Sequence, residues 1–212
     1  MNKKIIVFDM DGVLVDTIPN AREAFLKIHP GMTADMYNDI HSGNYYTEAK
    51  KYEHLRISET EEQKEKRQAL YSEMKSKAPL FNGVKELLSS LHTDGYLLVL
   101  NTNAYEKNCI PLLENLGIKN LFDFISTAEI SKDKVQKFEL IKEKYGVSSK
   151  NLLFITDALG DVKDAAIAEV PTVAVTWGVH DRVYFERENH AHLLGIIDTV
   201  HDLHAFISEH YI

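Results

Sequence analysis

The chain has 212 residues, of which 44% are hydrophobic and 26% are charged, an ordinary globular composition that argues against wholesale disorder. Lysine plus arginine number 24 and aspartate plus glutamate number 32, and this net charge of −8 argues against a non-specific nucleic-acid binder, which needs a basic face. One cysteine excludes an intrachain disulfide, and no apolar run reaches the roughly 20 residues of a membrane span, so we expect a cytoplasmic protein with neither a nucleic-acid nor a membrane partner.

Short apolar runs rich in β-branched residues predict the strands of a sheet. The runs are residues 5–8, 97–100, 152–155 and 172–175, with a weaker run at 122–125. They do not alternate with polar residues, which indicates that both faces of the sheet are buried. Helical patterns at 84–91 and 138–145 have a length that suits crossover connections. The sequence therefore predicts an α/β fold with a Rossmann-like, doubly wound parallel sheet.

The regular alternation is interrupted once, by about 90 residues without a strand run between the first and second strands. An apolar stripe over 21–28 and a capping-box pattern at 58–61, which precedes a long charged segment, predict helices there. We therefore expect an α/β core domain of residues 1–16 and 80–212, with a helical cap domain of residues 17–79 inserted after the first strand.

Acidic and polar side chains follow three of the predicted strands. Asp9 and Asp11 follow the first strand, Thr102 follows the second, and Asp157 and Asp161 follow the fourth along the chain. A single aspartate in such a place is usually a turn or a cap. Two pairs at one edge of a parallel sheet repel one another unless a cation neutralises them. Oxygen ligands of this kind suit Mg²⁺.

This set of residues is suited to phosphoryl transfer. A carboxylate fixed beside Mg²⁺ can attack phosphorus, because the metal also withdraws charge from the phosphoryl oxygens. A second acid two residues along can protonate the leaving oxygen and later activate water. A threonine hydroxyl and a lysine can hold the remaining phosphoryl oxygens. The pattern therefore indicates a reaction through an aspartyl-phosphate.

The segments that carry this pattern resemble the haloacid dehalogenase-like superfamily of hydrolases. Residues 9–17 resemble its first motif, a DxD followed by a glycine-led turn, and residues 100–103 resemble the second. Asp157 and Asp161 resemble the fourth motif, in which two acids are four residues apart. The resemblance covers about residues 1–17 and 80–180, and the helical insert falls where the family places a C1 cap.

The resemblance implies a catalytic role for each matching residue. Asp9 would be the nucleophile, and Asp11 would be the general acid and base. Thr102, with Asn103 beside it, would bind the phosphoryl group that is transferred. Family members that cleave carbon–halogen bonds lack the second acid, so Asp11 favours phosphate-ester hydrolysis over dehalogenation.

The resemblance also implies the Mg²⁺ site. The expected metal residues are Asp9, Asp11 and Asp157, and Met10 would offer its backbone carbonyl. Asp161 would bind the ion through water or orient its ligands.

The third motif of the family is a lysine, and residues 131–138 offer three candidates. One register of the following helix gives Lys134, and another gives Lys132. Lysines are mostly solvated surface charges, and the proline that often follows this lysine in relatives is missing. We favour Lys134 as the phosphate-binding lysine over Lys132, and both over Lys137.

Together these observations predict a Mg²⁺-dependent phosphatase that hydrolyses a small phosphorylated metabolite. The alternatives are a phosphomutase acting on a sugar phosphate, a receiver-like phosphoacceptor domain and a catalytically idle binding protein. The order of the motifs and the insert argue against a receiver, and the joint presence of the acids argues against an idle protein. The sequence indicates neither the substrate nor the oligomeric state.

Several other conspicuous residues receive structural explanations. His190, His192, His201 and His204 are expected in a final helical stretch, with surface or capping roles. His180 is a candidate for the mouth of the site. We expect the aromatic residues of the insert, such as Tyr45 and Tyr46, mostly to pack within the cap, with some touching the leaving group.

Overall fold

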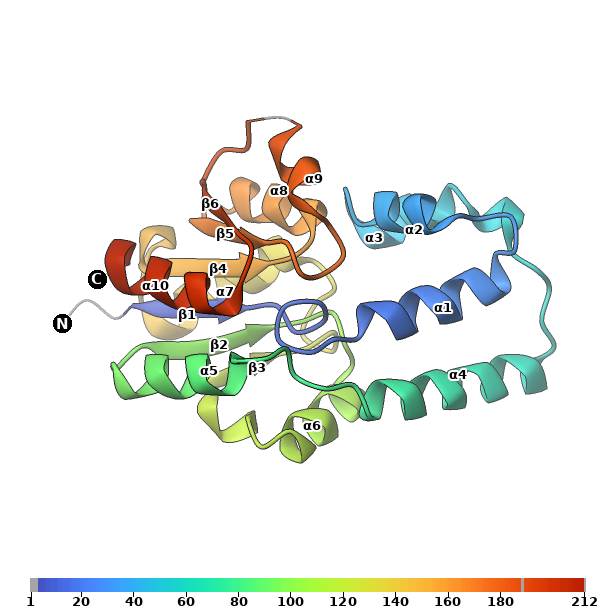
Figure 1. Cartoon of the computed structure of the whole chain (residues 1–212), viewed down its shortest axis with the longest axis horizontal. Helices are drawn as coiled ribbons and strands as arrows, with labels where there is room; N and C mark the ends of the chain where they lie inside the picture. The colour runs from blue at the N-terminus through green and yellow to red at the C-terminus, as the bar shows by residue number, and fades with distance from the viewer. Residues whose placement is uncertain (1–3, 188, 212) are drawn as a thin grey trace.

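The computed structural model describes residues 4–187 and 189–211, so residues 1–3 and 212 of the expected core lie outside the described residues. The described residues form one sheet of six parallel strands in the order β3-β2-β1-β4-β5-β6. The strands are β1 (Ile5–Phe8), β2 (Leu97–Asn101), β3 (Phe124–Ser126), β4 (Leu152–Thr156), β5 (Thr172–Val175) and β6 (Leu193–Ile197). This is the order of a doubly wound Rossmann-like sheet, and the predicted fold class is confirmed (Figure 1).

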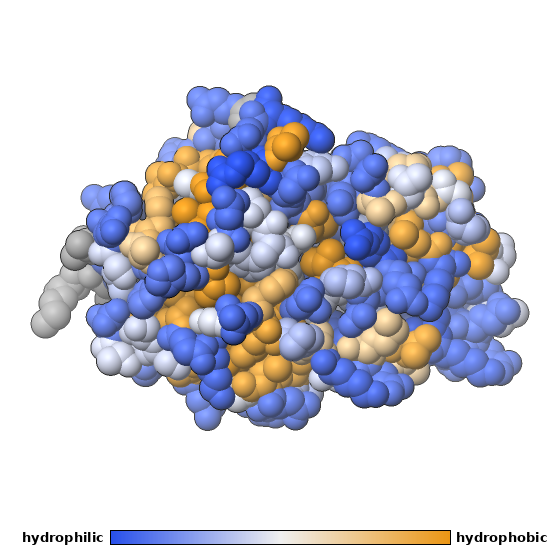
Figure 2. Space-filling model, viewed as in Figure 1, coloured by the Kyte–Doolittle hydropathy of each residue, from blue (hydrophilic) through white to orange (hydrophobic). Residues whose placement is uncertain are grey.

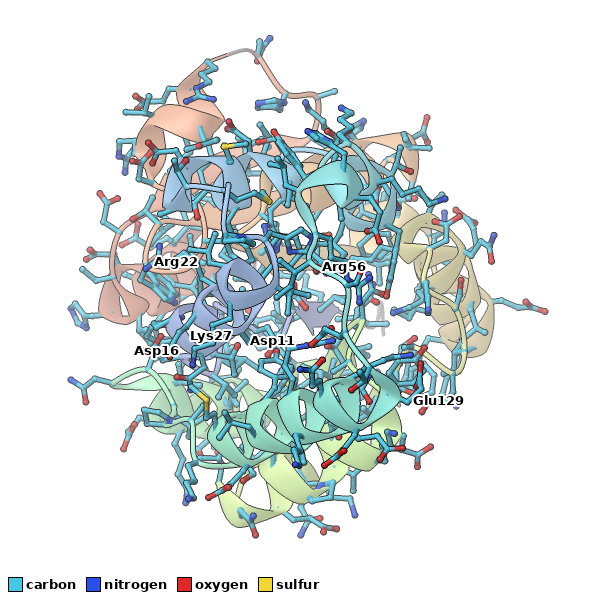
Figure 3. The ribbon with its side chains drawn as sticks, turned by 90° about the vertical axis from the view of Figure 1, so that its right-hand side faces the viewer. Asp11, Asp16, Arg22, Lys27, Arg56 and Glu129 are labelled. Atoms are coloured by element: carbon cyan, nitrogen blue, oxygen red, sulfur yellow. The ribbon has the colours of Figure 1, made fainter. Side chains whose placement is uncertain are left out.

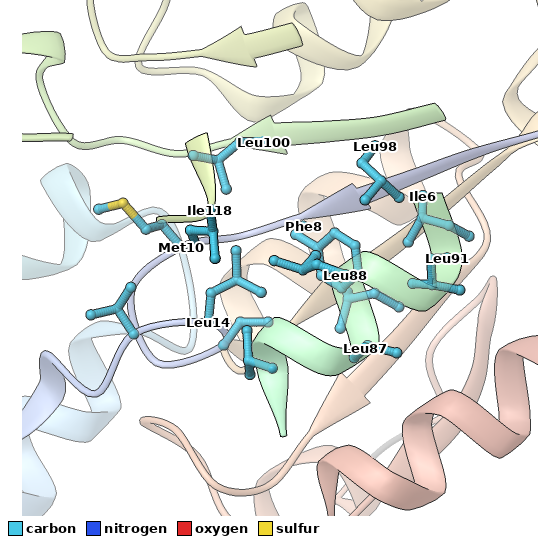
Figure 4. Packing of buried hydrophobic residues seen from close by; sticks show 14 of the residues in the cluster. Ile6, Phe8, Met10, Leu14, Leu87, Leu88, Leu91, Leu98, Leu100 and Ile118 are labelled. Carbon is cyan, nitrogen blue, oxygen red and sulfur yellow. The ribbon is translucent and has the colours of Figure 1, made fainter. Parts of the chain in front are cut away.

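Helices cover both faces of the sheet. Successive residues of each strand point to opposite sides, and apolar residues on both sides pack against these helices. Ile6 and Phe8 of β1 pack with α5 (Val84–Thr93), α6 (Glu106–Asn115) and α10 (Val200–His210), as Figure 4 shows for part of this cluster. Ile5 and Val7 face α7 (Lys134–Tyr145) and α8 (Leu159–Ile167). The four residues of β1 are fully buried, which explains why the strand is a continuous apolar run.

The end of the chain corrects the expected final helical stretch. Residues 193–197 form the edge strand β6, and only 200–210 are helical. β6 is mostly half-buried and contains Gly195, so its residues lack the solid apolar pattern of the central strands. His190 and His192 therefore precede a strand, whereas His201 and His204 lie in α10. The short helix α9 (Arg182–Glu186) lies between β5 and β6.

Helices fill the insert between β1 and β2. They are α1 (Ile18–Ile28), α2 (Ala34–Ile40), α3 (Tyr45–Lys50), a single 3-10 turn η1 (Glu53–Leu55) and α4 (Glu61–Ser76). The capping box of α4 is formed by Thr60 and Gln63, so the predicted box at 58–61 was wrong by two residues. The two further 3-10 turns, η2 (Lys119–Leu121) and η3 (Ser149–Asn151), belong to the core.

The insert helices lie beyond the carboxyl ends of the strands, at the right of Figure 1. The chain enters and leaves them through two adjacent segments: Val15 and Leu80 form an antiparallel bridge, and the amide of Asp16 donates to the carbonyl of Pro79 at 2.9 Å. We keep residues 17–79 as the proposed extent of the cap. Hydrophilic side chains cover much of its outer end (Figure 2). Within the described residues, none of the helices is long and apolar enough to cross a membrane.

Candidate active site

The strand order brings the predicted acids to one edge of the sheet. β1 and β4 are neighbours, and the amide of Asp9 donates to the carbonyl of Ile155 at 3.0 Å. Asp157 lies two residues after Ile155. Both aspartates therefore lie at the point where the strand order of the doubly wound sheet reverses. That is the place at which open α/β sheets bind ligands.

Lys134 links the two predicted acid pairs. It is the first residue of α7 and is buried, and its Nζ lies 2.9 Å from Oδ2 of Asp9 and 2.5 Å from Oδ2 of Asp161. Burial raises the pKa of Asp9 to about 7, and the charges of Asp161 and Asp11 add to this effect while Lys134 opposes it. For Asp161, burial acts in the same upward direction, but Lys134 and a hydrogen bond from Thr156 hold its pKa below the usual value.

Asp157 is buried, and within the described residues it forms no ion pair with a cationic side chain. Its Oδ2 accepts a hydrogen bond from the amide of Val179 at 2.7 Å. Burial and the charge of Asp9 raise the pKa of Asp157 well above its usual value. Two glycines make room for it, since a Cβ on Gly12 would lie 1.9 Å from this oxygen and one on Gly178 would lie 2.1 Å from it. Gly12 also has a φ of +78°, which favours glycine.

The charges of this cluster fit a divalent cation. Asp9, Asp157 and Asp161 bring three negative charges when ionised and Lys134 brings one positive charge, which leaves −2. No group of three or more His, Cys, Asp or Glu side chains within residues 4–187 and 189–211 is arranged to hold a metal ion. Mg²⁺, however, usually takes only one or two carboxylates and completes its shell with water and substrate oxygens. Asp9 and Asp157 therefore suffice as its carboxylate ligands.

Asp11 is held by the insert. Its Oδ1 accepts a hydrogen bond from the Thr17 hydroxyl at 2.6 Å, and Nζ of Lys75 lies 2.7 and 2.8 Å from its two oxygens. Lys75 belongs to the last turn of α4 and is the buried residue of that helix. Seen from the cap end, Asp11 lies between the ribbons of α1 and α4 (Figure 3). Sequence reasoning missed Lys75, because it is one of several lysines in a charged helix.

The residues after β2 form a turn that a buried lysine supports. The Thr102 hydroxyl accepts a hydrogen bond from the amide of Ala104 at 3.0 Å. Nζ of Lys137 donates to the Thr102 carbonyl at 2.7 Å and to Oδ1 of Asn103 at 2.8 Å. Burial and the neighbouring Lys134 lower the pKa of Lys137 to about 7. Lys137, which we ranked last of the three lysines, thus lies beneath the predicted phosphate-binding turn.

The third lysine lies outside this cluster. Lys132 is exposed, and its Nζ is 4.8 Å from the ring centroid of Tyr46 and 5.5 Å from that of Tyr105. The structure therefore places Lys134, and not Lys132, against Asp9.

A cavity of about 320 Å³ connects these residues. Asp9, Asp157, Thr102, Asn103 and Lys134 line it from the core, and side chains of α1, α2, α3 and α4 line it from the insert. Cys109 does not line this cavity. Cys109 is buried, which raises the pKa of its thiol to about 12.

His180 is buried and connects the core to the insert. Its Nδ1 accepts from the amide of Leu159 at 2.9 Å, which leaves Nε2–H to donate to the carbonyl of Asn38, also at 2.9 Å. It does not line the cavity. Its role in this structure is to hold the end of α2 against the start of α8.

Comparisons with known proteins agree with this geometry. Residues 6–175 match the family described as haloacid dehalogenase-like hydrolase. A phosphoglycolate phosphatase of Mesorhizobium japonicum is 27% identical over 199 residues, which cover 86% of each chain. One from Yersinia pestis is 26% identical over 189 residues, which cover 82% of this chain and 81% of the relative.

Solved structures share the fold. A predicted phosphatase from Clostridium acetobutylicum has a TM-score of 0.76 at 21% identity and covers 99% of this chain and 100% of its own. A putative β-phosphoglucomutase from Thermotoga maritima has a TM-score of 0.74 at 20% identity and covers 97% of this chain and 99% of its own. The family match spans most of the chain, and the two relatives, which cover 86% and 82% of it, are both named as phosphatases. The chain belongs to the haloacid dehalogenase-like hydrolase family and is a hydrolase of the phosphatase type.

Proposed function

We propose that this chain is a Mg²⁺-dependent phosphatase that hydrolyses the phosphate ester of a small metabolite through an aspartyl-phosphate on Asp9. One observation carries the proposal. The Asp9 carboxylate lies at a strand end between a buried lysine and a second buried aspartate, in a cavity large enough for a small ester. A carboxylate in such a place is shielded from bulk water and directed at the bound phosphorus.

Two chemical steps follow from this arrangement. An oxygen of Asp9 attacks phosphorus, the bond from phosphorus to the ester oxygen breaks, and Asp11 gives a proton to the departing alcohol. Asp11 then takes a proton from water, which hydrolyses the aspartyl-phosphate and frees Asp9. Thr102, Asn103 and Lys134 hold the phosphoryl oxygens in both steps.

Asp9 and Asp157 are the proposed side-chain ligands of Mg²⁺, with the backbone carbonyl of Met10. Asp161 orients the site through Lys134. When bound, Mg²⁺ neutralises the excess negative charge of the cluster and withdraws charge from the phosphoryl oxygens. Asp11 was also in the expected metal set, but Thr17 and Lys75 already occupy its two oxygens, so we assign it the proton transfers and not a place at the ion.

The test is the variant Asp9→Asn, with Asp35→Asn as the matched control on the exposed start of α2. We expect Asp9→Asn to lower kcat by at least about a thousandfold, since it removes the nucleophile, and Asp35→Asn to keep it. Rapid acid quench of the wild type with a ³²P-labelled ester should trap label on the protein, and Asp9→Asn should trap none. Turnover by Asp9→Asn near the wild-type rate would rule out the mechanism.

A phosphomutase remains the second candidate, because the fold is shared with a putative β-phosphoglucomutase. That reaction uses the same first step but returns the phosphoryl group to the sugar. Release of inorganic phosphate from a hexose phosphate supports the phosphatase, whereas isomerisation of the hexose phosphate without release supports the mutase.

A further inference from the structure

Five of the residues that line the cavity are tyrosines. Tyr37 comes from α2, Tyr45 and Tyr46 from α3, and Tyr71 from α4, while Tyr105 precedes α6 in the core. The rings of Tyr45 and Tyr46 lie 5.6 Å apart, edge to face. Four of these five tyrosines, which together we call the aromatic wall, belong to the insert.

Three of the tyrosines that line the cavity have hydroxyls with a raised pKa. Burial raises the pKa of Tyr37 and raises that of Tyr45 to about 12, and in both cases the neighbouring Tyr71 adds to the effect. Burial likewise raises the pKa of Tyr71, although Lys75 opposes it. All three hydroxyls are therefore uncharged at neutral pH, and each can both donate and accept a hydrogen bond.

Both lysines of the cavity are already paired with carboxylates. Lys75 contacts both oxygens of Asp11, and Lys134 contacts Asp9 and Asp161. Within the part of the chain that the structure describes, five aspartates, two lysines and no arginine line the cavity. Burial lowers the pKa of His41, which also lines it, so this imidazole is neutral at pH 7.

A further cation beside the aromatic wall lies outside the cavity lining. Lys132 is exposed, and its ammonium lies against the rings of Tyr46 and Tyr105. A carboxylate on the leaving group would therefore enter a field dominated by aspartates without a free buried cation to meet it. Burying such a charge unpaired is strongly unfavourable.

We infer that the leaving group of the substrate is an uncharged polyhydroxy alcohol, of the size of a sugar or smaller polyol, and that the hydroxyls of Tyr37, Tyr45 and Tyr71 select it. This inference rests on the proposed phosphatase function. A sugar presents C–H faces to aromatic rings and hydroxyls to the tyrosine oxygens. The relatives named for phosphoglycolate act on an ester whose leaving group carries a carboxylate, so this chain differs from them in substrate charge.

Pairs of esters in which a CH2OH group of one member is a carboxylate in the other provide the test. Glycerol 3-phosphate is compared with 3-phosphoglycerate, 2-hydroxyethyl phosphate with phosphoglycolate, and sorbitol 6-phosphate with 6-phosphogluconate. We expect kcat/KM to be at least about tenfold higher for the uncharged member of each pair that is hydrolysed, as for a lost buried hydrogen bond or an unpaired charge. Equal or faster hydrolysis of the carboxylate members overturns the inference.

Variants test the assigned residues. Tyr45→Phe and Tyr71→Phe keep the rings but remove the hydroxyls, and each should lower kcat/KM for the preferred polyol ester by about tenfold. The same variants should lower kcat/KM for 4-nitrophenyl phosphate by a smaller factor, because that leaving group offers no aliphatic hydroxyls. Tyr52→Phe, in the insert but outside the cavity lining, is the matched control and should change neither value.

The readout with 4-nitrophenyl phosphate separates the two levels of the proposal. If the wild type hydrolyses it in an Asp9-dependent manner but shows no preference within the ester pairs, only the inference about the leaving group fails. Equal losses on both substrates in the Tyr→Phe variants also overturn it. If neither 4-nitrophenyl phosphate nor any other ester is hydrolysed, the proposed function fails and the inference fails with it.

Discussion

Removing the charge of Asp9 should stabilise the metal-free protein at high pH. The pKa of Asp9 rises from 3.8 to about 7 on folding, chiefly because the carboxyl is buried. Between these two pH values the folded protein holds a proton that the unfolded chain has lost. The stability that this proton provides is therefore fully present below pH 3.8 and is lost as the pH rises through about 7. A shift of about three units corresponds to about 4 kcal/mol.

Two buried histidines also make the free energy of unfolding depend on pH, so the effect of Asp9 has to be measured as a difference between the wild type and Asp9→Asn. Burial lowers the pKa of His180 from 6.5 to about 4, and it also lowers the pKa of His41. Since the unfolded chain binds these protons more tightly, their contribution makes stability rise with pH between about 4 and 6.5, opposite to that of Asp9. Both terms are present in the wild type and in Asp9→Asn, so they cancel when the two free energies of unfolding are subtracted.

The assay is urea unfolding of wild type and Asp9→Asn in EDTA from pH 4 to 8. The advantage of Asp9→Asn should grow with pH and reach up to about 4 kcal/mol at pH 8, or on the order of 10 °C in Tm. Added MgCl₂ should stabilise the wild type at pH 8 by mass action and stabilise Asp9→Asn much less. A difference that stays flat with pH, or an Asp9→Asn variant that is less stable at pH 8, would refute the view that Asp9 carries uncompensated charge.

Three further substitutions probe the packing around the site. Gly12→Ala should cost about 1–3 kcal/mol and lower kcat, because φ is +78° and the new Cβ would lie 1.9 Å from Oδ2 of Asp157; wild-type urea unfolding and kcat would contradict this. Gly160→Ala places a Cβ 2.2 Å from the carbonyl of Gly43, so it should separate the insert from α8 and speed limited proteolysis of the insert; an unchanged cleavage rate would argue against this contact. Lys137→Met removes two hydrogen bonds from the turn after β2 and should cost about 1–3 kcal/mol and raise KM; an unchanged KM would mean that the turn holds its shape without the lysine.

The sequence allowed the position of the core acids to be predicted, because parallel strands bring the residues that follow them to one edge of the sheet. Each acid follows a continuous apolar run, and the carboxyl ends of such strands meet at one edge whatever the intervening chain does. Asp9 and Asp157 are 148 positions apart by number but follow neighbouring strands in the sheet. The sequence distinguished less well among the three candidates for the phosphate-binding lysine, since Lys132, Lys134 and Lys137 differ only in their position relative to the start of one helix. Position at the start of α7 decides it, because the first helical residue points back toward the strand ends.

The cavity-lining residues of the insert could not be predicted from the sequence, because their positions in the cavity depend on how the insert packs against the core. Lys75 is buried in α4 while Lys64 and Lys66 of the same helix stay paired with glutamates at the surface. No local sequence pattern distinguishes these lysines. Lys75 differs because it contacts the carboxylate of Asp11, which lies 64 residues earlier in the chain. The tyrosines pose the same problem: an aromatic residue in a helix packs against its own domain or lines a cavity according to how the domain meets its neighbour. Sequence periodicity describes a helix face, whereas the cavity lining is a surface shared by α2, α3, α4 and the strand ends.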